Sequence, residues 1–119
     1  MNKRNPGVLL IDNDLENRRW LRKILSKQGW YVSAATDGMA ALVRLRNQKN
    51  MFHLVLTETQ MPCLTGPELV EEIRQRKIKV AIIGMSSRQG DKKLYKYFWN
   101  KKGQLKNLLA LIKQLLAKQ

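Results

Sequence analysis

Short apolar runs that alternate with amphipathic segments constrain the fold of this chain more than any other feature of its sequence. Apolar runs of about four to eight residues are typical of buried strands, and an apolar residue every three or four positions is typical of helices. Strands are predicted over residues 7–12, 30–36, 53–58, 79–86 and 94–99. Helices are predicted over residues 14–29, 37–48, 65–77 and 103–119.

This alternation predicts an α/β fold with a parallel sheet that helices cover on both faces. Connections between parallel strands are right-handed, which leaves a doubly wound three-layer sandwich as the expected architecture. The chain has 119 residues, a length typical of one domain, so residues 1–119 are predicted to form a single domain. In such folds the functional crevice lies at the carboxyl ends of the central strands.

Three of the predicted helices begin with recognisable capping residues. Asp14 and Asp37 stand where an N-cap is expected, because a short polar side chain can accept a hydrogen bond from the first backbone N–H groups. Thr65 is followed three residues later by Glu68, the spacing of a capping box.

Polar side chains follow the ends of four predicted strands. Asp12 and Asn13 come after the first strand, Glu58 ends the third, Ser86 ends the fourth and Lys101 follows the fifth. Because the carboxyl ends of parallel strands lie at one edge of the sheet, these side chains are predicted to converge there.

Four motifs occur in a fixed order along the chain: VLLIDND, LVLTETQMPCLTG, AIIGMSS and YFWNKKG. In this order and spacing they resemble the receiver domain of two-component response regulators over nearly the whole chain. The resemblance implies a flavodoxin-like, five-stranded sheet in the order 2-1-3-4-5. It also implies a role in signal transduction, with a histidine kinase or another signalling protein as the partner.

In that family an aspartate after the third strand accepts a phosphoryl group from a histidine kinase. Mg²⁺ is held by that aspartate, by an acidic pair after the first strand and by a backbone carbonyl. A serine or threonine and a lysine bind the phosphoryl oxygens. The resemblance places these roles, in the same order, at Glu58, at Asp12 with Asn13, at Gln60, at Ser86 and at Lys101.

The sequence departs from the family pattern at three of these positions. Glu58 replaces the acceptor aspartate, Asn13 replaces an acidic residue, and Lys102 replaces the proline after the lysine. The first two changes lengthen the acceptor and remove a metal-binding charge, so we expect a degenerate site with no catalysis, no metal and no cofactor; Mg²⁺ would matter only in a competent site. Because a cis bond before a non-proline residue costs about 3 kcal/mol, the Lys101–Lys102 bond is predicted to be trans.

Glu58 itself has two interpretations. Its longer side chain could reach toward Lys101 and Ser86 and partly imitate the phosphorylated state. Alternatively, it is a tolerated polar residue that pairs with Lys101 in a silent pocket, since one carboxylate has fewer charges and acceptor oxygens than a phosphoryl group.

The connection before the last strand is unusually short. If residues 95–99 form that strand, only residues 87–94 remain for the crossover, and a crossover with its helix normally takes at least about 10 residues. Helix 4 of the receiver fold is therefore predicted to be shortened or lost. Phe98 lies at the aromatic-switch position of the family, or is an ordinary strand aromatic.

The chain carries a net charge of +14 at pH 7. Between residues 88 and 106 only Asp91 is acidic. Such charge favours polyanionic partners or is simply a solvated surface. The predicted basic face comprises Arg88, Lys92, Lys93, Lys96, Lys102 and Lys106.

These observations favour a stand-alone pseudo-receiver that binds a protein partner independently of phosphorylation. A receiver that still accepts phosphate in a phosphorelay is one alternative. Binding of nucleic acid or another anionic surface through residues 88–106 is the other. A cytoplasmic location is expected, because the N-terminus has no signal-peptide pattern, no apolar run could span a membrane, and Cys63 is the lone cysteine.

Overall fold

The computed structural model describes residues 5–48 and 50–119. Within them, five parallel strands form one sheet in the order β2-β1-β3-β4-β5. This confirms the predicted α/β fold and the strand order that the family resemblance implied. The strands are β1 (Gly7–Ile11), β2 (Tyr31–Ala35), β3 (Leu54–Glu58), β4 (Ala81–Ser86) and β5 (Tyr97–Asn100).

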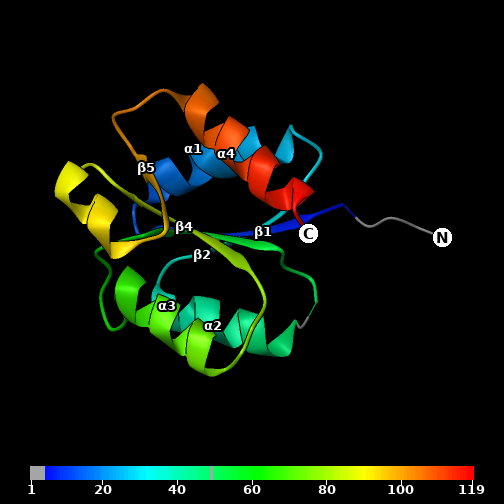
Figure 1. The fold of residues 1–119 in the computed structure, drawn as a ribbon, viewed down its shortest axis with the longest axis vertical. Coiled ribbons are helices and arrows are strands. Elements are labelled where there is room, and N and C mark those ends of the chain that lie inside the picture. Colours follow the sequence, from blue (N-terminus) through cyan, green and yellow to red (C-terminus); the bar gives the residue numbers. More distant parts are fainter. Residues whose placement is uncertain (1–4, 49) are drawn as a thin grey trace.

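Helices cover both faces of this sheet and complete the predicted three-layer sandwich. They are α1 (Leu15–Ser26), α2 (Gly38–Asn47), α3 (Gly66–Gln75) and α4 (Leu105–Ala117). Figure 1 shows α1 and α4 together on one side of the sheet and α2 and α3 on the other. None of the helices in the described part of the chain has the length and hydropathy needed to cross a bilayer.

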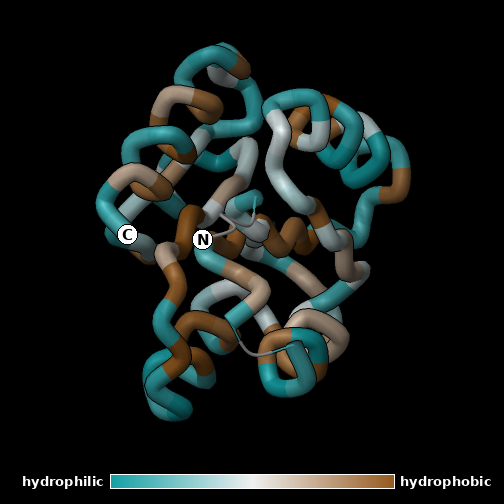
Figure 2. Tube along the Cα trace, turned by 90° about the vertical axis from the view of Figure 1, so that its right-hand side faces the viewer, coloured by the Kyte–Doolittle hydropathy of each residue, from teal (hydrophilic) through white to brown (hydrophobic). Residues whose placement is uncertain are grey.

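Alternate residues of strand β1 pack into the two hydrophobic clusters on opposite faces of the sheet. All five residues of β1 are buried. Val8 and Leu10 pack in the cluster beneath α1 and α4, whereas Leu9 and Ile11 pack in the cluster beneath α2 and α3. In Figure 2 hydrophobic and hydrophilic residues alternate along the helices, so each helix has one apolar side for the sheet.

The helix starts follow the predicted capping pattern. The side chains of Asp14 and Asp37 each accept a hydrogen bond from a backbone N–H in the first turn of the following helix. Thr65 and Glu68 form a complete capping box, with N···O distances of 2.9 and 3.2 Å. These caps fix where α1, α2 and α3 begin and therefore where the loops at the carboxyl edge of the sheet end.

Among the described residues, the crossover between β4 and β5 contains only a 3-10 helix, η1 (Gln89–Leu94). The receiver fold has its fourth helix in this crossover, before the helix labelled α4 here. The prediction that this crossover helix is short is therefore confirmed. The prediction of a strand over residues 94–99 was wrong at its start, because β5 begins at Tyr97. Leu94 is the last residue of η1. Tyr95 lies before the strand, where its side chain contacts Gly84 of β4 and Thr59 in the loop after β3.

Tyr95 occupies space that two glycines leave open. A Cβ added to Gly84 in β4 would collide with the Tyr95 ring, and one added to Gly66 would collide with its hydroxyl. That hydroxyl donates a 3.0 Å hydrogen bond to Oγ1 of Thr59. Burial raises the pKa of the Tyr95 phenol, so the hydroxyl stays protonated and can keep donating. The ring therefore fills the space beside β4 that these two glycines leave open.

This contact predicts that Gly84→Ala lowers the free energy of unfolding by about 1–3 kcal/mol, because the new methyl group overpacks against Tyr95. In a Tyr95→Ala background the same substitution should cost much less. Urea denaturation followed by circular dichroism measures both values.

Gly90→Ala is the matched control, since an added Cβ there meets nothing within 4 Å. It should change the free energy of unfolding by less than about 0.5 kcal/mol. An equal cost of Gly84→Ala with and without the Tyr95 ring would show that the ring does not occupy this space.

Candidate functional site

Asp12 is the best-anchored group of the candidate site. It follows β1, and its side chain is fully buried. Oδ1 accepts a 2.9 Å hydrogen bond from the backbone N–H of Asp14, and Oδ2 accepts one from the amide of Asn17. The guanidinium of Arg18 donates to the backbone carbonyl of Asp12 at 2.7 Å. The first turns of α1 thus hold this carboxylate in one orientation.

Lys101 brings a positive charge to this carboxylate. Its backbone N–H donates to the carbonyl of Ser86 at 2.9 Å, which continues the β4–β5 pairing past the end of β5. From there Nζ lies 3.2 Å from Oδ2 of Asp12 and 2.9 Å from Oε1 of Glu58. One ammonium group therefore bridges the carboxylates that follow β1 and end β3.

Glu58 has an unequal pair of carboxylate oxygens. Oε1 pairs with Lys101, but Oε2 is buried and accepts no hydrogen bond from any residue that the structure describes. Burial raises the pKa of Glu58, and the nearby Asp12 adds to the rise; the hydrogen bond from Lys101 offsets only part of it. Glu58 is thus the member of the cluster that takes up a proton first.

The other two groups of the cluster keep their charges. Burial alone would raise the pKa of Asp12, but hydrogen bonds from the Asp14 N–H and Asn17, together with Lys101, hold it below its ordinary value. Burial alone would lower the pKa of Lys101, but the hydrogen bond to Glu58 and the charge of Asp12 raise it above its ordinary value. The cluster is therefore a charged ion pair, Asp12 with Lys101, beside a carboxyl group that protonates more readily.

Ser86 forms its hydrogen bonds with residues outside this cluster. The sequence suggested that Glu58 could reach both Lys101 and Ser86. Instead the Ser86 hydroxyl donates to Oδ2 of Asp91 at 2.7 Å and accepts from the backbone N–H of Arg88 at 3.0 Å. Sequence reasoning missed Asp91 as a partner, although its position as the only acid between residues 88 and 106 was a signal.

The other two predicted metal-site residues, Asn13 and Gln60, are both exposed. Within residues 5–48 and 50–119, no three His, Cys, Asp or Glu side chains lie together as a metal site would require. Mg²⁺ prefers several oxygen ligands in octahedral geometry, whereas here the carboxylates of Asp12 and Glu58 share the Lys101 ammonium. The residues present do not fit the Mg²⁺ site that the family implies.

The loop after Lys101 is regular. No peptide bond in the described residues is cis, so the Lys101–Lys102 bond is trans as predicted. The side chain of Asn100 accepts a hydrogen bond from the Lys102 N–H at 2.9 Å and closes the turn. Phe98 is half-buried, and its ring stacks on that of Tyr95 with centroids 6.3 Å apart.

All six residues of the predicted basic face are exposed. None of its six side chains forms an ion pair with another described residue. The Lys96 ammonium lies 5.5 Å from the centroid of the Tyr97 ring. Asp91, the one acid between residues 88 and 106, is buried, accepts a hydrogen bond from Ser86 and forms no ion pair with this face among the described residues.

The fold and the placed residues define a receiver-type domain, with an acid after β1, a carboxylate at the end of β3 and a lysine after β5. The sequence model of the response regulator receiver domain family matches residues 8–103. The chain belongs to this family and is a receiver domain of the two-component signalling type.

Several curated proteins are related to the chain over part of their length. The two-component response regulator ARR22 of Arabidopsis thaliana is 29% identical over 85 residues, covering 71% of this chain and 60% of the relative. The response regulator-like protein APRR3 of the same plant is 31% identical, covering 88% and 24%. The sensor histidine kinase RcsC of Escherichia coli is 34% identical, covering 67% and 8%. The chain thus spans between 8% and 60% of these relatives.

Solved structures of receiver domains share the fold. The receiver domain of the Francisella response regulator 1452 superposes with a TM-score of 0.84 at 22% identity, covering 96% of this chain and 98% of that one. The response regulator TrrA of Thermotoga maritima, solved with Mg²⁺ and BeF, gives 0.83 at 23% identity, covering 92% and 98%. At these identities the likeness shows the fold.

The shared ammonium predicts a pH-dependent cost for Lys101→Met. Near pH 7 the variant should lose about 3 kcal/mol of unfolding free energy, because two carboxylates remain in the site without their cation. Losing the cation raises the folded-state pKa of both carboxyls. The folded variant then binds more protons than the wild type as pH falls, so the loss should shrink toward about pH 4.

Urea denaturation at a series of pH values measures this difference. Lys102→Met is the matched control, because Lys102 is exposed and forms no ion pair among the described residues. It should change stability by less than about 0.5 kcal/mol at every pH. A cost of Lys101→Met that stays constant with pH would show that the carboxylates do not depend on the ammonium.

Proposed function

We propose that this chain is a pseudo-receiver, a signalling module that binds a protein partner without phosphoryl transfer, catalysis or a cofactor. The observation on which the proposal rests is the Lys101 ammonium, which both carboxylates of the site already hold at 2.9 and 3.2 Å. In a working receiver these groups would bind a metal ion and a phosphoryl group. Here the Lys101 ammonium pairs with both carboxylates.

The geometry of the acceptor position supports this proposal. Glu58 is longer than the aspartate of the family pattern by one methylene group, and a misplacement of about 1 Å in a reacting group can reduce a rate on the order of 100-fold. The exposed amide of Asn13 removes a charge that Mg²⁺ would need. The two changes act on the same reaction, so their effects combine.

The groups around the acceptor support the proposal independently. The Ser86 hydroxyl donates to Asp91, and no hydrogen bond among the described residues joins it to Glu58 or Lys101. Glu58 therefore reproduces only one of the two contacts that a phosphoryl group would make. We interpret Glu58 as a fixed partner of Lys101 in a silent pocket, and not as an imitation of the phosphorylated state.

The partner is proposed to be an acidic protein surface that contacts the basic face. Six exposed cations on and around η1, β5 and α4, without ion-pair partners among the described residues, leave a positive surface that an acidic protein would neutralise. A histidine kinase or another signalling protein of the cytoplasm is the class of partner that the family membership favours.

A small phosphodonor tests the chemical part of the proposal. Incubation with Mg²⁺ and acetyl phosphate should leave the intact mass of the wild-type chain unchanged. The double variant Asn13→Asp/Glu58→Asp restores the family pattern at both positions and should gain the mass of one phosphoryl group.

Asn13→Asp/Glu58→Asn is the matched control. It carries the restored acid without an acceptor carboxylate and should stay unmodified. A stoichiometric phosphoryl adduct on Glu58 of the wild-type chain would instead identify a competent receiver in a phosphorelay.

Charge reversal tests the binding part. A partner captured by the wild-type chain and identified by mass spectrometry should bind Lys92→Glu/Lys93→Glu at least about tenfold more weakly, because the interface then carries like charges. Binding curves from surface plasmon resonance give the ratio.

Lys23→Glu/Lys27→Glu makes the same charge change on and after α1, away from the basic face, and should bind almost normally. Nuclease treatment before capture separates protein from nucleic acid partners. Equal weakening in both variants, or loss of the captured material after nuclease, would contradict a specific acidic protein partner.

A further inference from the structure

A pocket of about 740 Å³ lies at the amino edge of the sheet, opposite the Glu58 site. Its walls are formed by the C-terminal end of α2, the segment that leads into β3, and the segment between α3 and β4. The strand β3 separates this pocket from Glu58 by roughly 13 Å. A volume of this size is typical of small-molecule sites, which occupy about 300–1,000 Å³.

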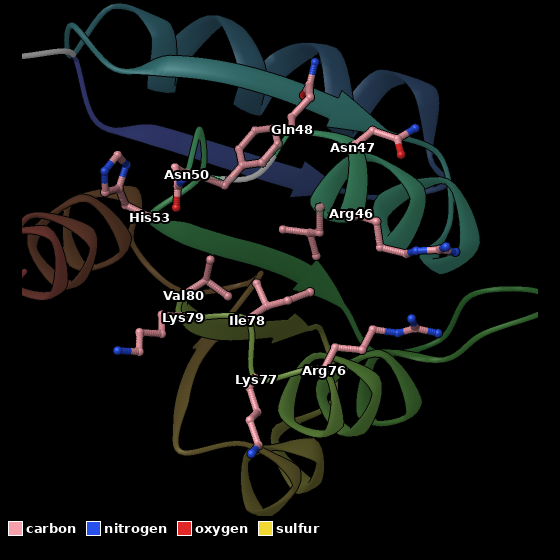
Figure 3. A pocket seen from close by; sticks show the side chains of 12 residues that line it. Arg46, Asn47, Gln48, Asn50, His53, Arg76, Lys77, Ile78, Lys79 and Val80 are labelled. Carbon is pink, nitrogen blue, oxygen red and sulfur yellow. The ribbon is translucent and has the colours of Figure 1, made fainter.

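The floor of the pocket is apolar. Ile78 and Val80 are only partly buried and pack against the core cluster beneath α2 and α3. Phe52, which is nearly fully buried, closes the floor, and its ring stacks on Tyr31 with centroids 6.2 Å apart. Figure 3 shows Ile78 and Val80 between the walls of the pocket. This surface can receive a ring or another apolar group of a ligand.

The walls of the pocket are cationic. Arg46 comes from α2 and Arg76 from the end of α3, and Figure 3 shows their guanidinium groups extending at the same end of the pocket. Lys77 and Lys79 add two further charges at the rim. Among the described residues that line the pocket there is no aspartate or glutamate. The local field therefore favours an anion over a neutral or cationic molecule.

The two arginines are available to a ligand. Arg46 forms neither an ion pair nor a side-chain hydrogen bond with a described residue, whereas the Arg44 guanidinium donates hydrogen bonds to Ser33 and to the Ala34 carbonyl. Arg76 pairs with Glu72 at 3.2 Å, but both side chains are more than one third exposed, so this pair is weak. Planar guanidinium groups bind phosphate oxygens in a bidentate manner.

Neutral donors complete the site. Asn47 and Asn50 line the pocket with amide groups. His53 also lines it, and its Nδ1 accepts a 3.0 Å hydrogen bond from the backbone N–H of Gly7. In the neutral imidazole the proton is then on Nε2, which is left as a donor. The pocket thus combines cations and donors at its walls with an apolar floor.

We propose that this pocket binds a small phosphorylated organic molecule of about nucleoside monophosphate size. Its phosphate lies between Arg46 and Arg76, and its ring rests on Ile78 and Val80. A phosphate monoester carries close to two negative charges near pH 7, which two guanidinium groups match. This site is independent of the degenerate receiver site and would operate whether or not Glu58 can be phosphorylated.

Titration with AMP, inorganic phosphate and adenosine tests the proposal. Amide signals followed by NMR locate the binding, and their shifts give the dissociation constants. AMP should bind at least tenfold more tightly than either fragment, with the largest shifts between residues 46 and 53 and between residues 76 and 80. Arg46→Gln/Arg76→Gln should weaken AMP binding at least tenfold.

Arg19→Gln/Arg74→Gln is the matched control. It removes the same number of charges from exposed positions on α1 and α3, and its Arg74 also pairs with a glutamate of α3. This variant should bind AMP within twofold of the wild type. Thermal unfolding of both variants checks that they remain folded.

Equal weakening in the two double variants would show diffuse electrostatic attraction and would overturn the proposal. AMP binding no tighter than that of inorganic phosphate would overturn it too, because the apolar floor would then contribute nothing. Tight binding of an acidic peptide at the same amides, with no binding of AMP, would assign the pocket to a protein partner instead.

Discussion

One ammonium group joins the ends of three strands in this domain, and the geometry of the carboxyl edge depends on it. Asp12 follows β1, Glu58 ends β3 and Lys101 follows β5, so the ion pairs connect segments far apart in the sequence. Removing charges from water costs several kcal/mol for each ion, and a cluster persists only where hydrogen bonds and opposite charges offset that cost. Asp12 meets this condition through Asn17 and a backbone N–H, whereas Glu58 retains one buried oxygen without a partner among the described residues. The charged groups of the site thus pair with one another through Lys101.

The helices and strands were predictable because their signals are local, whereas the order of the strands in the sheet came from the family resemblance. Apolar runs, helical spacing and capping residues such as Asp14 and Thr65 each act within a few positions, and each gave the element observed. The start of β5 was not predictable in this way. Tyr95 reads as a strand residue, but its position depends on the space that Gly84 and Gly66 leave beside it, eleven and twenty-nine positions earlier. Such a contact exists only once the sheet and α3 have formed.

The residues of the candidate site also divide into those that local sequence signals predict and those that depend on the folded structure. Asp12, Glu58 and Lys101 could be brought together from the sequence because each lies at the end of a strand in a parallel sheet. The contact of Ser86 with Asp91 depends on the path of a short 3-10 helix, which no periodicity describes. The pocket at the amino edge was missed for a different reason. Arg46 and Arg76 lie 30 positions apart, at the C-terminal ends of α2 and α3, and they share no motif.

The packing of the Tyr95 ring bears on whether the domain can switch between two conformations. A conformational switch needs two conformations with different affinities for its ligand. A ligand that binds both conformations equally does not shift the equilibrium between them. The Tyr95 ring packs against Gly84 and Gly66, donates a hydrogen bond to Thr59 and stacks on Phe98, so a second arrangement at the switch position would have to break these contacts. Under the proposed function, such a module would act by mass action, through the number of copies present relative to its affinity for the partner.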